Sequence, residues 1–121
     1  MGMILKEMGR VAYVTGTAVG TAQTLYTNLT TTDASISHVI IHNTHTSPIV
    51  VTLCLVPDTG GVADNADIND EYWQQPVPAS ETYTVDIPVY FTDTGDTLQI
   101  YAATGSKINA YAMGFTMPDQ S

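Results

Sequence analysis

Short runs of β-branched, aliphatic and aromatic residues recur along the whole chain, and turn-forming residues separate them at near-regular spacing. Many short runs of this kind are typical of a sandwich built from antiparallel strands. We therefore predict an all-β fold, an antiparallel β-sandwich of jelly-roll type with about eight short strands. The expected strands lie near residues 11–15, 21–27, 35–43, 48–56, 71–77, 81–87, 96–103 and 107–116.

A chain of 121 residues fits one domain, which can bury a hydrophobic core without a metal or a disulfide. We expect residues 11–121 to form this domain and residues 1–10 to form a short N-terminal arm. The single cysteine, Cys54, excludes an intrachain disulfide.

The last two expected strands show the clearest alternation. A three-residue loop at 104–106 would join them as a hairpin, with Ala103 opposite Lys107. One face would then be small and aliphatic, as a core requires, and the other would be aromatic and polar. The aliphatic face comprises Leu98, Ile100, Ala102, Ile108, Ala110 and Ala112. The aromatic face comprises Gln99, Tyr101, Asn109, Tyr111, Met113 and Phe115.

The strand expected at 48–56 is apolar on both faces. Ile49, Val51, Leu53 and Leu55 alternate with Val50, Thr52, Cys54 and Val56. A sheet with one solvent face shows a polar second face instead. We therefore expect a neighbouring molecule to cover the second face of this strand.

Charge restricts the possible partners. Twelve acidic residues against three basic ones give a formal net charge of −9, and two of the basic residues, Lys6 and Arg10, lie in the expected arm. Nucleic acids and anionic lipids are bound by clustered basic side chains, so neither is an expected partner. Residues 1–10 lack the pattern of a signal peptide, and no apolar stretch reaches the length of a membrane span, which predicts synthesis in the cytoplasm.

The residues that could carry chemistry favour structural roles. His38 and His42 would lie about 13 Å apart on a strand, too far to share one zinc ion. Cys54 would come near His38 if their strands paired, but a thiol within an apolar strand is an unreactive one. The acidic loop at 58–71 lacks the calcium-binding pattern of an EF-hand. We predict no catalytic residue, no metal site and no cofactor, and we do not expect an enzyme.

Exposed aromatic residues suggest binding. Tyr72, Trp73, Tyr101 and Tyr111 could stack on sugars, but such residues are also enriched where proteins meet. We favour a protein interface, with glycan binding as the alternative. The candidate interface comprises Tyr101, Tyr111, Met113, Phe115, Tyr72, Trp73, Lys6 and Arg10.

Six segments carry a resemblance to a known group of proteins. They are TLYT at 24–27, IIHN at 40–43, VVTLCLVP at 50–57, QPVPASET at 75–82, GDTLQIYA at 95–102 and NAYAMGF at 109–115. Together they resemble the small β-sandwich virion structural proteins of tailed bacteriophages, of the decoration, cement or tail accessory type.

The resemblance implies a structural component of the virion and carries over no catalytic residue. We expect a capsid decoration or cement protein that stabilises the particle through protein contacts. It would form a homo-oligomer, most simply a trimer, and would bind phage coat or tail proteins. The alternative is a tail, baseplate or fibre module that binds host glycans.

Overall fold

The computed structural model describes residues 6–28, 32–57, 66, 70–86 and 88–118. This part of the chain is all-β, apart from the short 3-10 helix η1 (Val19–Thr21). Its strands are β1 (Lys6–Val11), β2 (Gln23–Thr27), β3 (Thr32–Asn43), β4 (Ile49–Val56), β5 (Glu71–Val77), β6 (Thr82–Val85), β7 (Val89–Phe91), β8 (Thr97–Ala102) and β9 (Ile108–Pro118).

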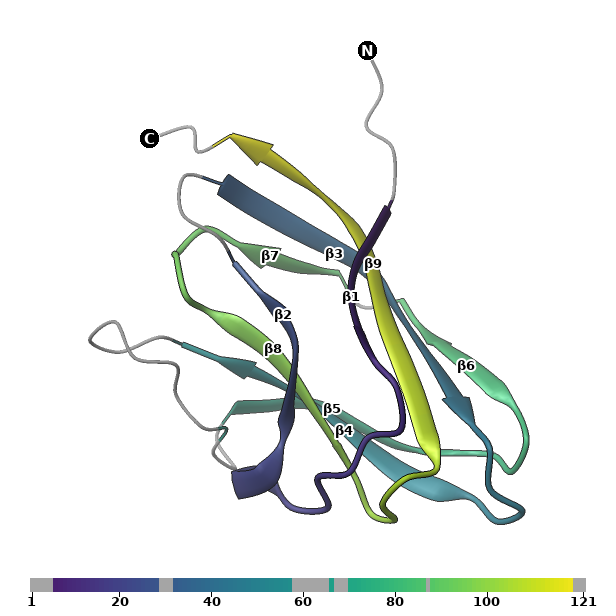
Figure 1. Cartoon of the computed structure of the whole chain (residues 1–121). Coiled ribbons are helices and arrows are strands. Elements are labelled where there is room, and N and C mark those ends of the chain that lie inside the picture. The colour runs from purple at the N-terminus through teal and green to yellow at the C-terminus, as the bar shows by residue number, and fades with distance from the viewer. Residues whose placement is uncertain (1–5, 29–31, 58–65, 67–69, 87, 119–121) are drawn as a thin grey trace.

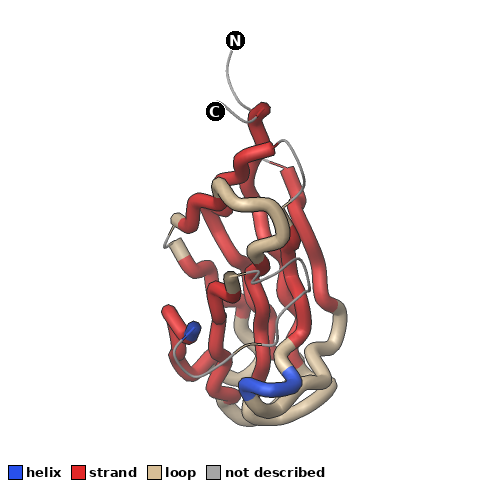
Figure 2. Tube along the Cα trace, turned by 90° about the vertical axis from the view of Figure 1, so that its left-hand side faces the viewer, coloured by secondary structure: helices blue, strands red, loops and turns tan. Residues whose placement is uncertain are grey.

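Two antiparallel sheets contain these strands. Sheet A has the order β1-β9-β3-β6, and β7 also pairs with β3, next to β6 along the same edge. Sheet B has the order β2-β8-β4-β5. The long strands of sheet A run side by side in Figure 1, whereas Figure 2 shows most loops and η1 gathered at the end away from both termini. The predicted all-β class with two antiparallel sheets is confirmed.

The core lies between the sheets and is mainly aliphatic. Sheet A contributes buried side chains that include Ile36, Val39 and Ile41 of β3, and sheet B contributes Leu53 of β4 and Ile100 of β8. All of these side chains are at most 1% exposed. Inward-facing β-branched and leucine side chains at alternate positions are what hold the two layers together.

The predicted hairpin of the last two strands is wrong. β8 belongs to sheet B and β9 belongs to sheet A, so the loop at 103–107 crosses between the sheets. The prediction of the inward faces nevertheless holds, since all six residues of the predicted aliphatic face are 0% exposed. Alternation identifies the side that faces the core, but it does not identify the sheet to which a strand belongs.

The N-terminal part also differs from the prediction. Lys6–Val11, mostly assigned to the arm, forms the edge strand β1 and pairs with β9, while residues 1–5 lie outside the described part. The expected strand at 11–15 is interrupted because Tyr13 adopts a left-handed φ of 57°. Beyond it, the chain links the sheets: Val14 N donates to the Ile108 carbonyl at 2.7 Å, and Ala102 N donates to the Gly16 carbonyl at 3.1 Å.

Close backbone approach shuts one side of the sandwich. A Cβ added to Gly9 of β1 would lie 1.7 Å from the carbonyl oxygen of Leu25 of β2, so only glycine permits this contact between the edges of the two sheets. The opposite side, formed by β5, β6 and β7, is shorter and includes a ring contact between Trp73 and Tyr83, whose centroids are 5.7 Å apart. β7, which the sequence did not predict, leaves a pocket there.

Candidate interaction surface

The outer face of sheet A carries a row of half-exposed apolar side chains that the sequence predicted to lie on one face of the last strand. Tyr111, Met113 and Phe115 alternate along β9 with Ala110, Ala112 and Gly114, which are buried. The strand register places Ile40 of β3 beside Tyr111. We call the four residues Ile40, Tyr111, Met113 and Phe115 the apolar strip.

Charged side chains border the strip on the β1 edge. Arg10 lies opposite Tyr111 in the register, and its Cζ is 5.0 Å from the ring centroid. Its Nε donates to Glu7 Oε1 at 2.5 Å. This hydrogen bond and the charge of Glu7 raise the pKa of Arg10. Because Arg10 is 60% exposed in its side chain, the ion pair contributes little to folding and leaves the guanidinium accessible.

Polar pairs border the strip on the other edge. His38 Nδ1 lies 2.7 Å from Asp86 Oδ1, and His42 Nδ1 lies 2.9 Å from Thr82 Oγ1. Among the described residues, no group of three or more histidine, cysteine or acidic side chains is placed to hold a metal ion. An apolar centre with charged and polar side chains around it is the usual composition of a protein interface.

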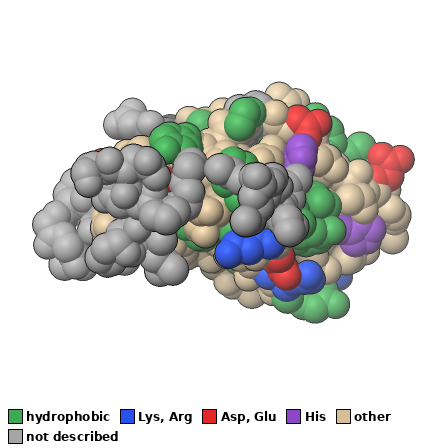
Figure 3. All heavy atoms as spheres, turned by 90° about the horizontal axis from the view of Figure 1, so that it is seen from above, with side chains coloured by type: hydrophobic (Ala, Val, Ile, Leu, Met, Phe, Trp, Pro, Cys, Tyr) green, Lys and Arg blue, Asp and Glu red, His purple; other side chains and the backbone are tan. Residues whose placement is uncertain are grey.

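Seen from above, hydrophobic side chains lie next to basic, acidic and histidine side chains (Figure 3). Lys6, the other basic residue of β1, is exposed and pairs in the register with Gly114 of β9. Three of the predicted interface residues on β9 and both predicted basic residues therefore lie on or beside one sheet.

The outer face of sheet B is different, because part of it is covered by this chain itself. Cys54 and Val56 of β4 form a small second cluster with Ala66, against which Val19 and Ala22 pack. Cys54 is 0% exposed and Val56 is 3% exposed. The expectation that a neighbouring molecule covers this strand is therefore wrong for these two residues. Only Val50, at the other end of the same face, is left 40% exposed.

Tyr101 belongs to this covered face and is separated from Tyr111. It packs against the second cluster, and its hydroxyl donates to Glu71 Oε2 at 2.6 Å. Partial burial and this hydrogen bond raise the pKa of Tyr101. The predicted common face of Tyr101 and Tyr111 is wrong, because β8 and β9 expose opposite sides of the sandwich.

Trp73 and Tyr72 of β5 are also less accessible than expected. Trp73 is 9% exposed and is part of the main core. Tyr72 packs against that core at a β-bulge, where its hydroxyl is buried. Burial raises the pKa of Tyr72. The four aromatic residues considered for sugar stacking therefore do not form one flat surface.

Cys54 and His38 lie in different sheets, so the strand pairing that would have brought them together does not occur. Burial, together with the negative charges of Glu71 and Asp70, raises the pKa of the Cys54 thiol to about 12. Such a thiol stays protonated at neutral pH and is a poor nucleophile.

Sequence reasoning missed two residues near the apolar strip. Ile40 lies within a predicted strand, and the alternation of that strand places it on the outer face, so the signal was present. Tyr90, which is 56% exposed, lies on β7, a strand of only three residues that directly follows Pro88. A run this short gives no usable alternation.

No protein family model matches the chain, and no curated protein matches it significantly. Among solved structures, the chain is similar to one from Bacillus endospore appendages, which form a family of disulfide-linked pili. The TM-score is 0.51 at 14% sequence identity, and the match covers 96% of this chain and 88% of that chain. At this identity the likeness shows a shared fold alone. No helix in the described residues is long and apolar enough to cross a membrane.

Proposed function

We propose that this protein is a structural subunit that assembles through the outer face of sheet A, and that its assembly is the decoration of a phage capsid. The observation that carries the proposal is the apolar strip with its charged and polar borders. A side chain such as Met113 there gains stability by losing water, which a neighbouring protein surface provides. A tail or fibre module would use the same surface in the same way.

The fold shared with the endospore appendage supports a structural role, since that protein builds a pilus. The linkage chemistry differs. This chain has a single cysteine, Cys54, and it is 0% exposed. Copies of this chain would therefore be held together by non-covalent contacts, and the apolar strip provides a surface for them.

Three further expectations come from the resemblance to small β-sandwich virion proteins. The sandwich is of jelly-roll type, the chain forms a closed homo-oligomer such as a trimer, and it is located in the virion with coat or tail proteins as partners. Its net charge of −9 favours a partner surface with basic side chains. The chain acts by binding and not by catalysis.

Substitution of the strip tests the proposal. We expect Tyr111→Asp/Met113→Asp to weaken self-association or particle binding by at least about tenfold, because two carboxylates would lose water at the interface. Val50→Asp is the control, because this apolar side chain is exposed on the outer face of the opposite sheet. Light scattering and particle co-sedimentation give the readout, and circular dichroism checks the fold. Undiminished binding by the double variant would overturn the proposal.

A further inference from the structure

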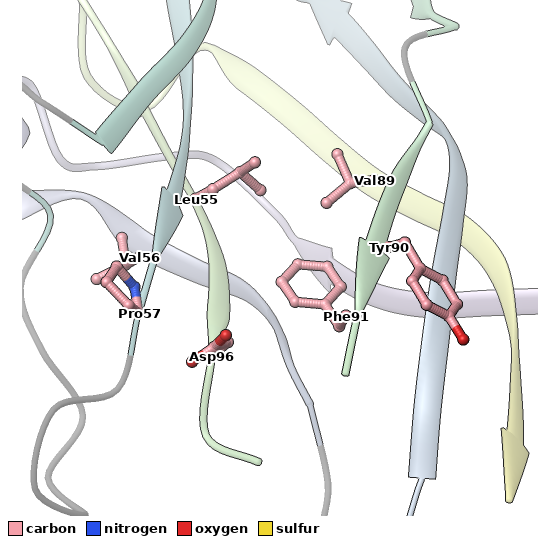
Figure 4. Close-up of a pocket in the computed structure, with 7 residues that line it drawn as sticks. All are labelled: Leu55, Val56, Pro57, Val89, Tyr90, Phe91 and Asp96. Atoms are coloured by element: carbon pink, nitrogen blue, oxygen red, sulfur yellow. The ribbon is translucent and has the colours of Figure 1, made fainter. Parts of the chain in front are cut away.

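A pocket lies on the short side of the sandwich, between the end of β4 and strand β7. Its volume is about 190 Å³, and its lining residues are Leu55, Val56, Pro57, Val89, Tyr90, Phe91 and Asp96. Leu55 on one side and Val89 and Phe91 on the other point toward the space between the strands, while Tyr90 is turned away (Figure 4).

The lining of the pocket is mostly apolar, with buried side chains in its depth and exposed residues at its rim. Val89, Phe91 and Val56 are each at most 8% exposed, whereas Tyr90 and Pro57 are exposed. An apolar cavity of about 150 Å³ can hold benzene. The space is therefore sufficient for one aliphatic side chain, and an open apolar pocket of this size gains stability when such a side chain displaces its water.

Residues 1–5 have the sequence Met-Gly-Met-Ile-Leu and lie outside the described part of the chain. Four of the five side chains are apolar, and the segment is too short to bury them within itself. The next residue, Lys6, is one of only three basic residues in the chain. Asp96 lines the pocket, and Asp93, three residues earlier in the same turn, is exposed. An apolar segment followed by a lysine thus matches an apolar pocket beside a carboxylate.

We propose that the pocket receives Ile4 or Leu5 from a second copy of the chain, with Lys6 of that copy beside Asp93. This inference rests on the proposed function, because it names a contact between subunits of the same assembly. The contact joins the β1 end of one copy to the β7 edge of another. A head-to-tail contact of this kind produces a closed ring when its rotation closes, as in a trimer.

The sheet geometry favours a second copy over the same copy. The register aligns Lys6 with Gly114, Gly114 with Ile36, and Ile36 with Val89, so three strand spacings separate Lys6 from the pocket. That distance is about 14 Å, and the direct route through the sandwich is filled by core side chains. Leu5 directly precedes Lys6 and Ile4 directly precedes Leu5, so even an extended segment places the Cα of Ile4 at most about 7 Å from that of Lys6. The segment is therefore too short to reach the pocket of its own copy.

Loss of the apolar side chains gives the first test. In the full chain, we expect Ile4→Asp/Leu5→Asp to raise the dissociation constant of the oligomer by about tenfold to a hundredfold, as measured by light scattering over a dilution series. Thr46→Asp/Ser47→Asp adds the same charge at exposed positions in another loop and controls for repulsion. Lys6→Asp should weaken association, and adding Asp93→Lys should restore it.

Cross-linking identifies the copy that supplies the segment. In a Cys54→Ser background, one chain carries Leu5→Cys and a second, larger tagged chain carries Pro57→Cys. We expect a disulfide between the two chains on mixing, and none within a chain that carries both cysteines at high dilution. A link formed only within one chain would overturn the second-copy proposal.

The failure of this inference differs from failure of the proposed function. An oligomer that resists Ile4→Asp/Leu5→Asp but dissociates with Tyr111→Asp/Met113→Asp overturns the pocket contact and leaves the proposed function standing. If Ile4→Asp/Leu5→Asp abolishes association and Tyr111→Asp/Met113→Asp does not, the pocket contact is supported and the role of the apolar strip is overturned. A chain that is monomeric at every concentration but still binds its particle overturns the pocket contact and the closed homo-oligomer, and leaves particle binding through the apolar strip standing.

Discussion

Arg10 of β1 lies over the ring of Tyr111 of β9, with its Cζ 5.0 Å from the ring centroid. The contact lies on the outer face of sheet A, where the guanidinium is largely exposed. It places a positive charge at the border of the apolar strip, in a chain whose net charge is −9. Arginine beside an aromatic ring is a frequent energetic centre of protein interfaces.

The first prediction separates assembly from folding at this contact. Arg10→Ala should raise the dissociation constant of the assembly by about tenfold and leave the urea midpoint of unfolding unchanged. Lys107→Ala removes the same charge from a residue that is not on the strip, and it should change neither the dissociation constant nor the urea midpoint. An unfolding midpoint that moves as much as the affinity would show that Arg10 supports the fold and not the interface.

Asn43 provides a prediction about stability. Its side chain is 0% exposed, and its Nδ2 donates to the carbonyls of Ser47 and Val77, each at 3.0 Å. Its Oδ1 accepts from His45 N at 2.8 Å. Asn43→Ala leaves three backbone groups without these partners, among them the buried Val77 carbonyl, and should lower the free energy of unfolding by about 2–3 kcal/mol in urea titrations.

Asn109 is the matched control for that change. Its Oδ1 accepts from the backbone N of Tyr13 at 2.7 Å, but at an exposed site where water can replace it. Asn109→Ala should therefore cost less than half as much. Equal losses from both variants would contradict the importance of burial at Asn43.

Gly114 predicts a steric effect. A Cβ at this position would lie 1.9 Å from the carbonyl oxygen of Ser35 on the neighbouring strand. Gly114→Ala must push β9 away from β3 and should lower the free energy of unfolding by more than about 3 kcal/mol, or prevent folding. A Cβ at Gly20 meets nothing within 4 Å, so Gly20→Ala should be close to neutral in thermal unfolding. Comparable melting temperatures for the two variants would show that β9 lies elsewhere.

Cys54 predicts a loss of stability at alkaline pH. Its pKa is raised to about 12 in the folded chain from an ordinary value near 9.0. Between these values the unfolded chain releases a proton that the folded chain keeps, so the free energy of unfolding falls as pH rises. Below about pH 8.5 this contribution is fully present.

The measurement is a set of urea titrations between about pH 8 and about pH 11. Cys54→Ala should be less pH-dependent over that range than the unsubstituted chain, whatever its stability at neutral pH. Tyr72, whose pKa is also raised by burial, should account for part of the remaining slope. If the free energy of unfolding depended on pH equally in both proteins, burial would not raise the pKa of Cys54.

The inward faces of the strands were predictable from sequence. Ile100 and Ile108 alternate with polar or aromatic neighbours, and burying one side of each strand specifies which residues face the core. The pairing of the strands was not predictable in the same way. Residues 103–107 can close a hairpin or cross to the other sheet with identical alternation on both sides, and only the rest of the fold decides between them.

The candidate surface was predicted in part. Tyr111, Met113 and Phe115 were placed on one face of one strand, which local alternation determines. Tyr101 was placed with them through the hairpin, so that error followed from the pairing. The cover over Cys54 comes from Ala66 and Val19, which are distant in sequence and carry no local signal. A surface covered by loops of the same chain resembles an interface when only the strand is considered.

The pairing of β1 with β9 sets the order in which the molecule can be completed. Lys6 meets Gly114, so a polypeptide made at about 5–20 residues per second must wait on the order of ten seconds before its first strand has a partner. The intervening strands can pair earlier, but β9 also forms the centre of sheet A by joining β1 to β3. Sheet A can therefore be completed only after β9 has been made, and chains shortened before β9 would expose the long edge of β3 to aggregation.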